Sequence, residues 1–379
     1  MRVSLVGADG IRRTDSDPTT PSSTGLATAL AYAGHEVTVL VRAERPGQRS
    51  RLTSESGYQL RRIAGTRLDA PHLAELTQAL KEHWNRQRPD VVHVRSRAFG
   101  DAAQQAADDL ELPLVQNVDA LGATDSPSSR RQADNYFELA ARADRVIVPS
   151  SVVKQQITTE GIPRLKIDLV PSGINLTLFD PKVTPIPADP PTRLLAFAAL
   201  TPQDGIDTLI EALIHLPDAR LVIGGGPSAA RLPQHAEAQR LRAHARRCGV
   251  ANRVKLLGRI SEAKMPALFA AADIAVCVPW HDAYGQTAMR AMACGLPVVA
   301  TSVGALADIV VPTATGVLIP PGQVSATVAA LRSLIRHPFQ AQAFGVSGQV
   351  RAATRYGWDR VCWETARCYE QTITGKGRV

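Results

Sequence analysis

Aromatic residues are scarce in this sequence. Phe, Trp and Tyr together account for 4% of its 379 residues, which is too few to build the base-stacking platforms of single-strand nucleic-acid binders. A formal net charge of +8, from 43 basic and 35 acidic residues, favours anionic partners in general. Because the excess is mostly arginine on predicted helical segments, such as 240–247, we expect no nucleic-acid partner.

Long apolar runs and paired cysteines are missing too. No apolar run approaches the ~18 residues that a membrane-spanning helix needs. The N-terminal MRVSLVGADG has one basic residue and no A-x-A-like site, which indicates a buried first strand rather than a signal peptide. The five cysteines include no C-x-x-C pair, so we expect buried thiols and neither disulfides nor a metal site. These absences predict a cytoplasmic protein without a transmembrane segment.

What is present is a regular alternation of short apolar strands and helices. At ~150 residues per domain the length indicates two domains, and the five prolines of LTLFDPKVTPIPADPP (176–191) mark a linker. Strand–helix alternation predicts parallel sheets covered on both faces. The expected fold is therefore α/β, with two doubly wound Rossmann-like domains facing a central cleft. The expected boundaries are 1–180, a linker at 181–192, 193–355, and a C-terminal helix at 356–379 that packs back on the first domain.

The strongest local signal lies in PWHDAYGQTAMRAMACGLPVVATSV (279–303). A loop carries Asp282, and Gly285 then opens a helix. The free amides of Gly285, Gln286 and Thr287, together with the helix dipole, would form an anion site. The same pattern occurs at ordinary strand–loop–helix joints, so the spacing alone leaves phosphate binding open.

This segment resembles the signature of the family 4 retaining glycosyltransferases of the GT-B fold, and mycothiol-type glycosyltransferases in particular. The signature reads Glu-x-Phe-Gly, four residues, Glu, then Ala-Met-Ala-Cys-Gly-Leu-Pro-Val-Val-Ala-Thr. Gly285 and the whole of AMACGLPVVAT (291–301) match it. Other matching segments keep the family's order along nearly the whole chain: GHEVTVL (34–40), PDVVHV (89–94), ADRVIVPS (143–150), VPSGINLTLFDP (170–181), GGGP (224–227), RVKLLGRIS (253–261), LFAAADIAV (268–276), ATGVLIPPG (314–322) and YGWDRV (356–361).

The resemblance implies a retaining, metal-independent glycosyltransferase with no permanently bound cofactor. Such enzymes hold a nucleoside-diphosphate sugar in the C-terminal domain and the acceptor in the N-terminal domain. A helix N-terminus, an Arg and a Lys stabilise the leaving diphosphate electrostatically. Two signature carboxylates hold the sugar hydroxyls and the ribose, and a His of the N-terminal domain lies near the reacting sugar.

This sequence departs from the family at most of those positions. The Arg and Lys positions hold Ala199 and Asp204. The second signature Glu is Arg290, and the first is the shorter Asp282. The family's His is replaced by Asp119, in the segment QNVDALG. Losing two cations from a diphosphate would cost roughly 3–6 kcal/mol, because each charge-assisted hydrogen bond is worth about 1.5–3 kcal/mol.

Asp119 and Asp282 are the candidate catalytic residues. Asp119 would stabilise oxocarbenium charge or assist deprotonation of the acceptor, and Asp282 would hold sugar hydroxyls. Arg290 would either replace the lost cationic contacts to the diphosphate or form a structural ion pair with Asp204, and both interpretations stay open. The remaining candidate contacts to the nucleotide-sugar are Gly224, Gly226, Gly258, Arg259, Gly285, Gln286 and Thr287.

Four side chains of the first domain are candidate acceptor contacts: Arg12, Arg13, His93 and Arg95. Arg12 and Arg13 follow the first strand and would bind an acidic acceptor or pair with nearby carboxylates. His93 and Arg95 follow a later strand, and Arg95 would either hold an anionic acceptor or be an ordinary rim arginine.

The predicted activity is transfer of a sugar from a nucleoside-diphosphate sugar to a small polar acceptor. We expect the reaction to belong to specialised metabolism, because an altered donor site suits an unusual sugar. The alternative is a catalytically silent relative that binds a ligand or partners an active enzyme. The family 4 signature disfavours a nucleotide-sugar epimerase. The first loop, Gly7-Ala8-Asp9-Gly10, lacks the G-x-G-x-x-G spacing of a dinucleotide dehydrogenase. The base, the sugar, the acceptor and the oligomeric state, with a homodimer as one option, stay open.

Overall fold

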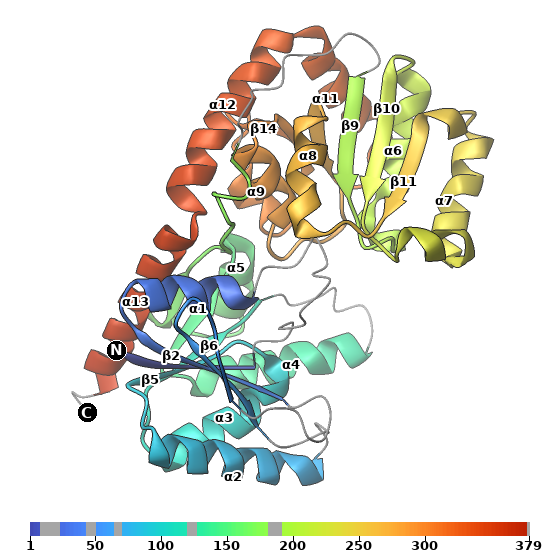
Figure 1. Cartoon of the computed structure of the whole chain (residues 1–379). Coiled ribbons are helices and arrows are strands. Elements are labelled where there is room, and N and C mark those ends of the chain that lie inside the picture. The colour runs from blue at the N-terminus through green and yellow to red at the C-terminus, as the bar shows by residue number, and fades with distance from the viewer. Residues whose placement is uncertain (8–22, 43–50, 64–69, 120–126, 181–191, 377–379) are drawn as a thin grey trace. The chain divides into compact units, whose positions relative to one another are not determined.

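The computed structural model describes residues 1–7, 23–42, 51–63, 70–119, 127–180 and 192–376. These residues divide into two compact units (Figure 1). The first unit holds the described residues up to Pro171 together with those from Trp358 onward, and the second holds the described residues of Ser172–Gly357. The candidate acceptor contacts Arg12 and Arg13 lie outside the described residues.

The first unit is built around a parallel sheet with helices on both faces. Its strands are β1 (Arg2–Val6), β2 (Glu36–Arg42), β3 (Arg51–Thr53), β4 (Gln59–Ile63), β5 (Val91–Val94), β6 (Leu114–Asn117), β7 (Arg145–Val148) and β8 (Ile167–Leu169). Their order across the sheet is β3-β4-β2-β1-β5-β6-β7-β8. All neighbouring pairs are parallel except β3 with β4. The helices are α1 (Ser23–Tyr32), α2 (Ala70–Arg86), α3 (Arg97–Asp109), α4 (Pro127–Arg142), α5 (Ser151–Thr159) and α13 (Trp358–Lys376).

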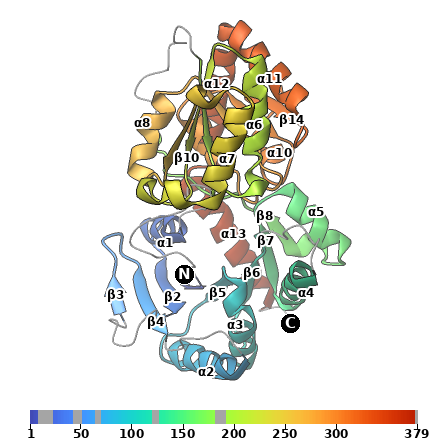
Figure 2. The ribbon, with the colours of Figure 1, turned by 90° about the vertical axis from the view of Figure 1, so that its right-hand side faces the viewer.

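Two hydrophobic clusters cover the two faces of this sheet. Successive side chains of a strand point to opposite faces, so Val3 and Leu5 of β1 pack with α1 and α13, whereas Val6 packs with α2 and α3. Figure 2 shows α1 and α13 on one face of the sheet, with α2 and α3 on the other. The doubly wound parallel sheet expected from the strand–helix alternation is therefore confirmed.

The hairpin formed by β3 and β4 was not predicted from the sequence. Arg51 lies opposite Arg61, and Leu52 lies opposite Leu60, in an antiparallel pair at the edge of the sheet. The β4 sequence, QLRRI, has two adjacent arginines and reads as a polar loop. Its pairing with β2 turns it into a strand, because β2 supplies the backbone partners from Thr38 to Arg42.

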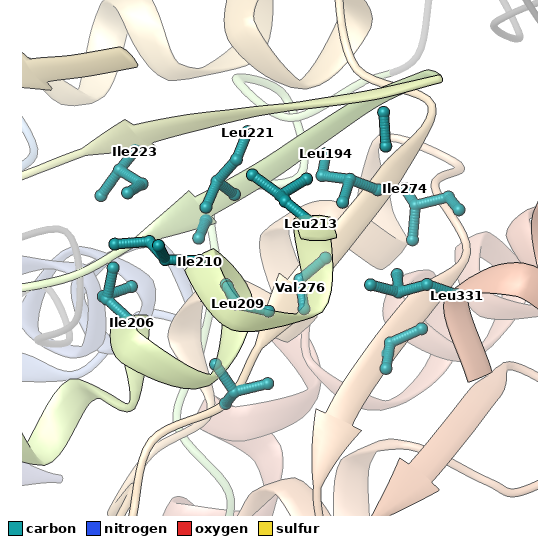
Figure 3. Close-up of a cluster of buried hydrophobic side chains, with 14 of the residues drawn as sticks. Leu194, Ile206, Leu209, Ile210, Leu213, Leu221, Ile223, Ile274, Val276 and Leu331 are labelled. Atoms are coloured by element: carbon teal, nitrogen blue, oxygen red, sulfur yellow. The ribbon is translucent and has the colours of Figure 1, made fainter. Parts of the chain in front are cut away.

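The second unit has a wholly parallel sheet. Its strands are β9 (Thr192–Phe197), β10 (Ala219–Gly224), β11 (Val254–Gly258), β12 (Ile274–Cys277), β13 (Val298–Thr301) and β14 (Gly316–Ile319), in the order β11-β10-β9-β12-β13-β14. Its helices are α6 (Ile206–Ala212), α7 (Ala236–Arg247), α8 (Met265–Ala270), α9 (Gln286–Ala293), α10 (Leu306–Ile309), α11 (Val324–Arg336) and α12 (Pro338–Arg355). Figure 3 shows the core on one face, where Leu209 of α6 and Leu331 of α11 pack with Leu194, Ile223 and Val276 of the strands.

The division between the units falls between Pro171 and Ser172, ahead of the expected boundary at residue 180. Ile174 and Phe179 are buried in the second unit's core, and Phe179 makes an edge-on ring contact with Phe269 at 6.1 Å between centroids. The amide of Ile174 also donates to the carbonyl oxygen of Tyr356 at 2.8 Å. These contacts attach Ile174 and Phe179 to the second unit, so the chain joins that unit before the first proline of the 176–191 stretch.

Helix α13 returns the C-terminal part of the chain to the first unit. Its Tyr369 is fully buried, and its hydroxyl lies 2.7 Å from Nδ1 of His93 on β5. Gly25 of α1 lies so close to the Trp358 ring that a Cβ there would collide with it. The α1–α13 contact therefore depends on a residue without a side chain.

All five cysteines are free, as expected from their spacing, and four of them are buried. Within the part of the chain that the structure describes, no helix is both long and apolar enough to cross a bilayer.

Burial of His93 makes the stability of the fold depend on pH. Burial, with a smaller contribution from the charge of Arg95, lowers the pKa of His93 from 6.5 to about 3. The unfolded chain therefore binds a proton at His93 as the pH falls below 6.5, whereas the folded chain does not. Stability is lost in this window, by about 2 kcal/mol between pH 7 and pH 5.

His93→Gln, which cannot be protonated, should remove this component. Urea unfolding at pH 7 and pH 5 should show a pH-dependent loss of unfolding free energy that is smaller than that of the wild type by about 2 kcal/mol. His337→Gln is the matched control, because His337 is exposed on the second unit. An identical pH dependence in all three proteins would contradict the burial argument.

Candidate active site

The loops that leave the carboxyl ends of β9, β10 and β12 carry most of the predicted donor-site residues. Ligands of parallel α/β sheets bind at this edge. The backbone joins two of these loops directly, because the amide of Trp280 after β12 donates to the carbonyl oxygen of Gln203 after β9 at 2.9 Å. Gly205 adds to this joint, since a Cβ there would collide with the carbonyl oxygen of Val278.

Asp282 organises the turn that precedes α9. Its Oδ1 accepts hydrogen bonds from the amides of Tyr284, at 2.9 Å, and Gly285, at 2.7 Å. Its carbonyl oxygen accepts from the amide of Ala305 at 2.9 Å. The expectation that the Gly285 amide is free for a ligand is therefore wrong, because the aspartate two to three residues earlier already caps it.

Gly285 is the residue that precedes α9, and its φ is 63°. This left-handed conformation is adopted most easily by a residue without a side chain. A Cβ there would also collide with Ile309. The first main-chain bond within the helix is the one from the Met289 amide to the Gly285 carbonyl, at 3.0 Å. The amides of Gln286 and Thr287 precede it, so they have no acceptor within the helix. With the helix dipole, these two amides give the opening of α9 a positive electrostatic potential.

The Gln286 side chain turns away from that opening into the protein. It is 1% exposed, and its Nε2 donates to Oγ of Ser172 at 2.9 Å and to the carbonyl oxygen of Gly173 at 3.3 Å. Its Oε1 is buried and has no hydrogen-bond partner among the described residues. Gln286 therefore ties the start of α9 to the segment that enters the second unit.

Arg290 lies inside the unit and is 2% exposed. One of its terminal nitrogens, Nη2, donates to Oε1 of Glu262 at 2.9 Å, and its guanidinium lies over the Phe179 ring at 5.4 Å from the centroid. Glu262 is a carboxylate that the sequence analysis did not name. Glu262 is half-buried, so removing it would leave the buried Arg290 charge without this carboxylate, whereas removing Arg290 would leave Glu262 in contact with water.

Asp204 serves as a helix cap. It ends the 3₁₀ turn Pro202–Asp204, and its Oδ2 accepts from the Thr201 amide at 2.6 Å and the Thr201 hydroxyl at 3.1 Å. Burial is the largest cause of the raised pKa of Asp282, and the negative charge of Asp204 raises it further. The amides of Tyr284 and Gly285 act in the opposite direction. Two carboxylates thus stand close enough to affect each other at this edge.

The glycines of GGGP allow three loops to pack closely. The amide of Gly225 donates to the carbonyl oxygen of Gly258 at 2.8 Å. Gly224 lies against the Phe197 ring, and Gly226 lies against Leu200. Side chains at these positions would collide with their neighbours, so packing alone already requires glycine there.

Gly258 and Arg259 end β11 beside this loop. Gly258 has a φ of 77°, and a Cβ there would collide with the Ala229 backbone. The amide of Arg259 donates to the carbonyl oxygen of Pro227 at 2.8 Å, and its side chain is exposed. The Arg259 side chain is therefore accessible at the same edge of the sheet.

In the first unit, a chain of hydrogen bonds ends at Asp119. Asn117, the last residue of β6, donates through Nδ2 to Oδ1 of Asp119. Asn117 Oδ1 lies 3.3 Å from Nε2 of His93, whose Nδ1 lies 2.7 Å from the Tyr369 hydroxyl. Because His93 is neutral, one tautomer satisfies every bond. The Tyr369 hydroxyl donates to His93 Nδ1, and His93 Nε2 donates to Asn117 Oδ1. This fixes the Asn117 amide group, whose Nδ2 donates to Asp119.

His93 is therefore an internal member of this chain, and it is buried at 1% exposure. Arg95 is half-buried, its amide donates to the Val6 carbonyl oxygen at 2.9 Å, and its charge lowers the pKa of His93. The sequence analysis missed Asn117 and Tyr369. Asn117 had a local signal, since it lies two residues before Asp119, but Tyr369 lies 276 residues from His93 and had none.

Two family models match this chain in succession. "Glycosyltransferase Family 4" matches residues 23–178, and "Glycosyl transferases group 1" matches residues 180–351. The two models correspond closely to the two units of the structure.

Similar proteins agree with these matches. A D-inositol 3-phosphate glycosyltransferase from Xylanimonas cellulosilytica is 28% identical over 382 aligned residues, which cover 91% of this chain and 89% of that protein. Sucrose-phosphate synthase from Thermosynechococcus elongatus has a TM-score of 0.82 at 22% identity and covers 99% of both chains. Anabaena Alr3699/HepE in complex with UDP-glucose has a TM-score of 0.76 at 20% identity and covers 98% of this chain and 100% of that chain.

The two structural matches support the same fold, two Rossmann-like domains of the GT-B type. The family models and the curated relative support a glycosyltransferase activity. This chain belongs to the group 1 and family 4 glycosyltransferases.

Proposed function

We propose that this glycosyltransferase moves a sugar from a nucleoside-diphosphate sugar to a small polar acceptor, with retention and without a metal ion. The bond between the anomeric carbon and the phosphate oxygen breaks, and its electron pair stays on the phosphate. The acceptor oxygen bonds to the same face of the sugar. The acceptor proton passes to the leaving phosphate or to a carboxylate.

The observation that carries this proposal is the opening of α9. The amides of Gln286 and Thr287 lie at the carboxyl edge of the sheet and have no acceptor within the helix. Preorganised amides of this kind stabilise charge that develops on a leaving diphosphate. Anabaena Alr3699/HepE, which shares this fold, was solved in complex with UDP-glucose, so a uridine diphosphate sugar is the first donor to test.

We assign the sugar hydroxyls to Asp282. Its Oδ1 is engaged by the Tyr284 and Gly285 amides, so the orientation of the carboxyl group is set before a donor binds. Its Oδ2 would then accept from a sugar hydroxyl. Gly224, Gly226, Gly258 and Arg259 would border the nucleotide at the same edge of the sheet.

In this proposal the donor site works with fewer cations than the family pattern implies. Ala199 and Asp204 stand where that pattern has Arg and Lys, and Arg290 is engaged with Glu262 inside the unit. Amide and dipole interactions would therefore hold most of the diphosphate charge. The Asp204 carboxylate opposes that charge, so the donor should bind with modest affinity.

On the acceptor side we assign Asp119 the role of stabilising positive charge on the reacting sugar or accepting the proton of the acceptor hydroxyl. Tyr369, His93 and Asn117 would position it without contacting substrate. Arg95, with Arg12 and Arg13, would favour an anionic acceptor. A curated relative is named for D-inositol 3-phosphate, so phosphorylated polyols are the first acceptors to test.

The activity itself is tested by incubating the protein with UDP-glucose and D-inositol 3-phosphate, and then with other nucleotide-sugars and polyol phosphates. We expect release of the nucleoside diphosphate that depends on the acceptor, with the donor's anomeric configuration kept in the product by NMR. Binding of nucleotides without turnover across the panel would support a catalytically silent protein instead.

The charge argument predicts an unusual gain of affinity. Asp204→Asn keeps an oxygen that can cap the turn but removes a negative charge near the diphosphate, so UDP should bind about tenfold more tightly, or about 1.4 kcal/mol. Asp218→Asn is the matched control, because Asp218 is exposed at the amino end of β10, opposite the donor edge. Calorimetry showing equal effects of the two substitutions would contradict the proposed place of the diphosphate.

The positioning role of Asn117 is tested by a double-mutant cycle. Asn117→Ala should lower kcat about 10- to 100-fold with little change in the donor KM, because Asp119 loses the group that orients it. In an Asp119→Asn background the same substitution should cost little, since the oriented carboxylate is already gone. Additive losses in kcat would show that Asn117 acts independently of Asp119.

A further inference from the structure

A cavity of about 500 Å³ lies between the β3–β4 hairpin and the C-terminal half of α2 in the first unit. Figure 2 shows the hairpin at the edge of the sheet, one face of which α2 covers. The charged and titratable residues of the lining are Arg51, Arg61, Arg62, Arg86, His83 and Glu82. Arg62 follows Arg61 in β4, so its side chain points to the opposite face of the sheet, and only its backbone borders the cavity.

Its lining carries a marked excess of positive charge. Among the described residues, the guanidinium groups of Arg51, Arg61 and Arg86 surround one carboxylate, that of Glu82, which pairs with Arg86 at 3.3 Å. Arg51 and Arg61 each donate to a neutral amide oxygen, that of Gln59 and that of Gln87, at 3.0 Å in both cases. With His83 neutral, these described groups carry two more positive than negative charges.

The backbone itself brings two of these cations together. Arg51 of β3 and Arg61 of β4 are directly opposite each other in the antiparallel pair. Like charges in such a cross-strand pair destabilise a sheet. The Nε of Arg61 is buried and has no hydrogen-bond partner among the described residues. A buried guanidinium donor that faces other arginines is costly unless an acceptor meets it.

The ordinary stabilising role of cations at a helix end explains only part of this cluster. His83 and Arg86 lie in the last turn of α2, where positive charge is favoured by the helix dipole. Arg51 and Arg61 come from the two strands and take no part in that turn. The helix dipole therefore does not explain why they lie beside the same cavity.

The cavity is separate from the candidate active site. The β3–β4 hairpin is at one edge of the sheet, and β2 and β1 lie between β4 and β5. The lining residues Ala79, Glu82, His83 and Arg86 belong to the C-terminal half of α2, and Gln87 follows that helix. Arg95 and Asp119, in contrast, follow β5 and β6, on the other side of β1.

We propose that this cavity binds a small soluble molecule through its phosphate group, between the guanidinium groups of the β3–β4 hairpin and the last turns of α2. Arginine suits this ligand because its planar guanidinium donates in pairs to phosphate oxygens. The volume accommodates a molecule larger than inorganic phosphate alone. Bound there, the anion relieves the repulsion between Arg51 and Arg61 and gives the buried Nε of Arg61 an acceptor.

The test uses inorganic pyrophosphate as the probe and the full-length protein in calorimetry at low and at physiological salt. Wild-type protein should bind it in this cavity and show a raised Tm, with an affinity that falls as salt rises. Arg61→Gln should weaken binding at least tenfold. Arg164→Gln, an exposed arginine elsewhere on the first unit, should leave binding unchanged.

Stability without the probe separates this proposal from a purely structural role of the cluster. If the cavity is a binding site, Arg61→Gln removes repulsion, so the unliganded protein keeps or gains Tm while the pyrophosphate-dependent rise disappears. If Arg61 serves only to hold Gln87 and the hairpin, Arg61→Gln lowers Tm, and pyrophosphate changes the Tm of wild type and variant by the same amount, whether or not it also binds at α9. The second pattern overturns the proposal.

His83 supplies a readout at the cavity itself. Burial, followed by the charges of Arg61 and Arg86, lowers the pKa of His83 to about 4. Arg51 faces the same cavity, and Glu82 is the carboxylate beside His83. A phosphate among these groups should raise the pKa of His83, as followed by NMR, in wild type and not in Arg61→Gln. An unmoved His83 resonance at saturating pyrophosphate would place the probe elsewhere.

A phosphate group can also belong to a lipid headgroup, so a vesicle arm completes the test. Flotation with vesicles that contain anionic phospholipid should recover no more wild-type protein than Arg61→Gln protein. Recovery on vesicles that depends on Arg61, without binding of pyrophosphate, would overturn the assignment to a soluble ligand.

Discussion

The geometry of the turn between β12 and α9 depends on one carboxyl oxygen, that of Asp282. Oδ1 of Asp282 accepts from the Tyr284 and Gly285 amides, and this turn sets the direction in which α9 leaves the sheet. The backbone of Asp282 is held in turn by the Ala305 amide. Gly304 and Gly285 allow this approach, because a side chain at either position would collide with its neighbours. The amides of Gln286 and Thr287 follow this turn and have no acceptor within the helix.

Charge in the second unit is arranged in an unusual way. A buried cation, Arg290, is compensated inside the unit by Glu262 and Phe179, whereas the edge of the sheet carries the carboxylates of Asp204 and Asp282. In the proposed function, a diphosphate at this edge would rely on backbone amides and the helix dipole rather than on charged side chains. Such groups cost no reorganisation at the moment of reaction, which makes the chemistry compatible with a weakly bound donor.

In the first unit, Asp119 is held by hydrogen bonds that begin at a residue distant in the sequence, Tyr369. Tyr369 of α13 reaches His93, and the bonds continue through Asn117 to Asp119. The helix that returns the chain to the first unit therefore also fixes the carboxylate. Burial keeps His93 neutral, so the direction of these bonds does not change in the neutral pH range.

Much of this architecture can be predicted from the sequence, and the features that cannot be predicted have physical reasons. The two sheets are identified by the apolar runs of β1, β5 and β12. The glycine before α9 marks the carboxyl end of β12 as the place of the predicted donor site. The hairpin of β3 and β4 is hidden, because arginines in a strand resemble a loop until a neighbouring strand supplies backbone partners. The capping of the Gly285 amide was readable, since an aspartate three residues earlier favours such a turn. The Tyr369–His93 and Arg290–Glu262 contacts join residues far apart in sequence, which no local pattern reveals.

A crystal structure of the protein with bound uridine diphosphate tests the central claim most directly. The account predicts that phosphate oxygens accept hydrogen bonds from the amides of Gln286 and Thr287, with Asp282 still capping Gly285 and Arg290 still paired with Glu262. A diphosphate held elsewhere, while the amides at the start of α9 bond to protein side chains, would contradict it.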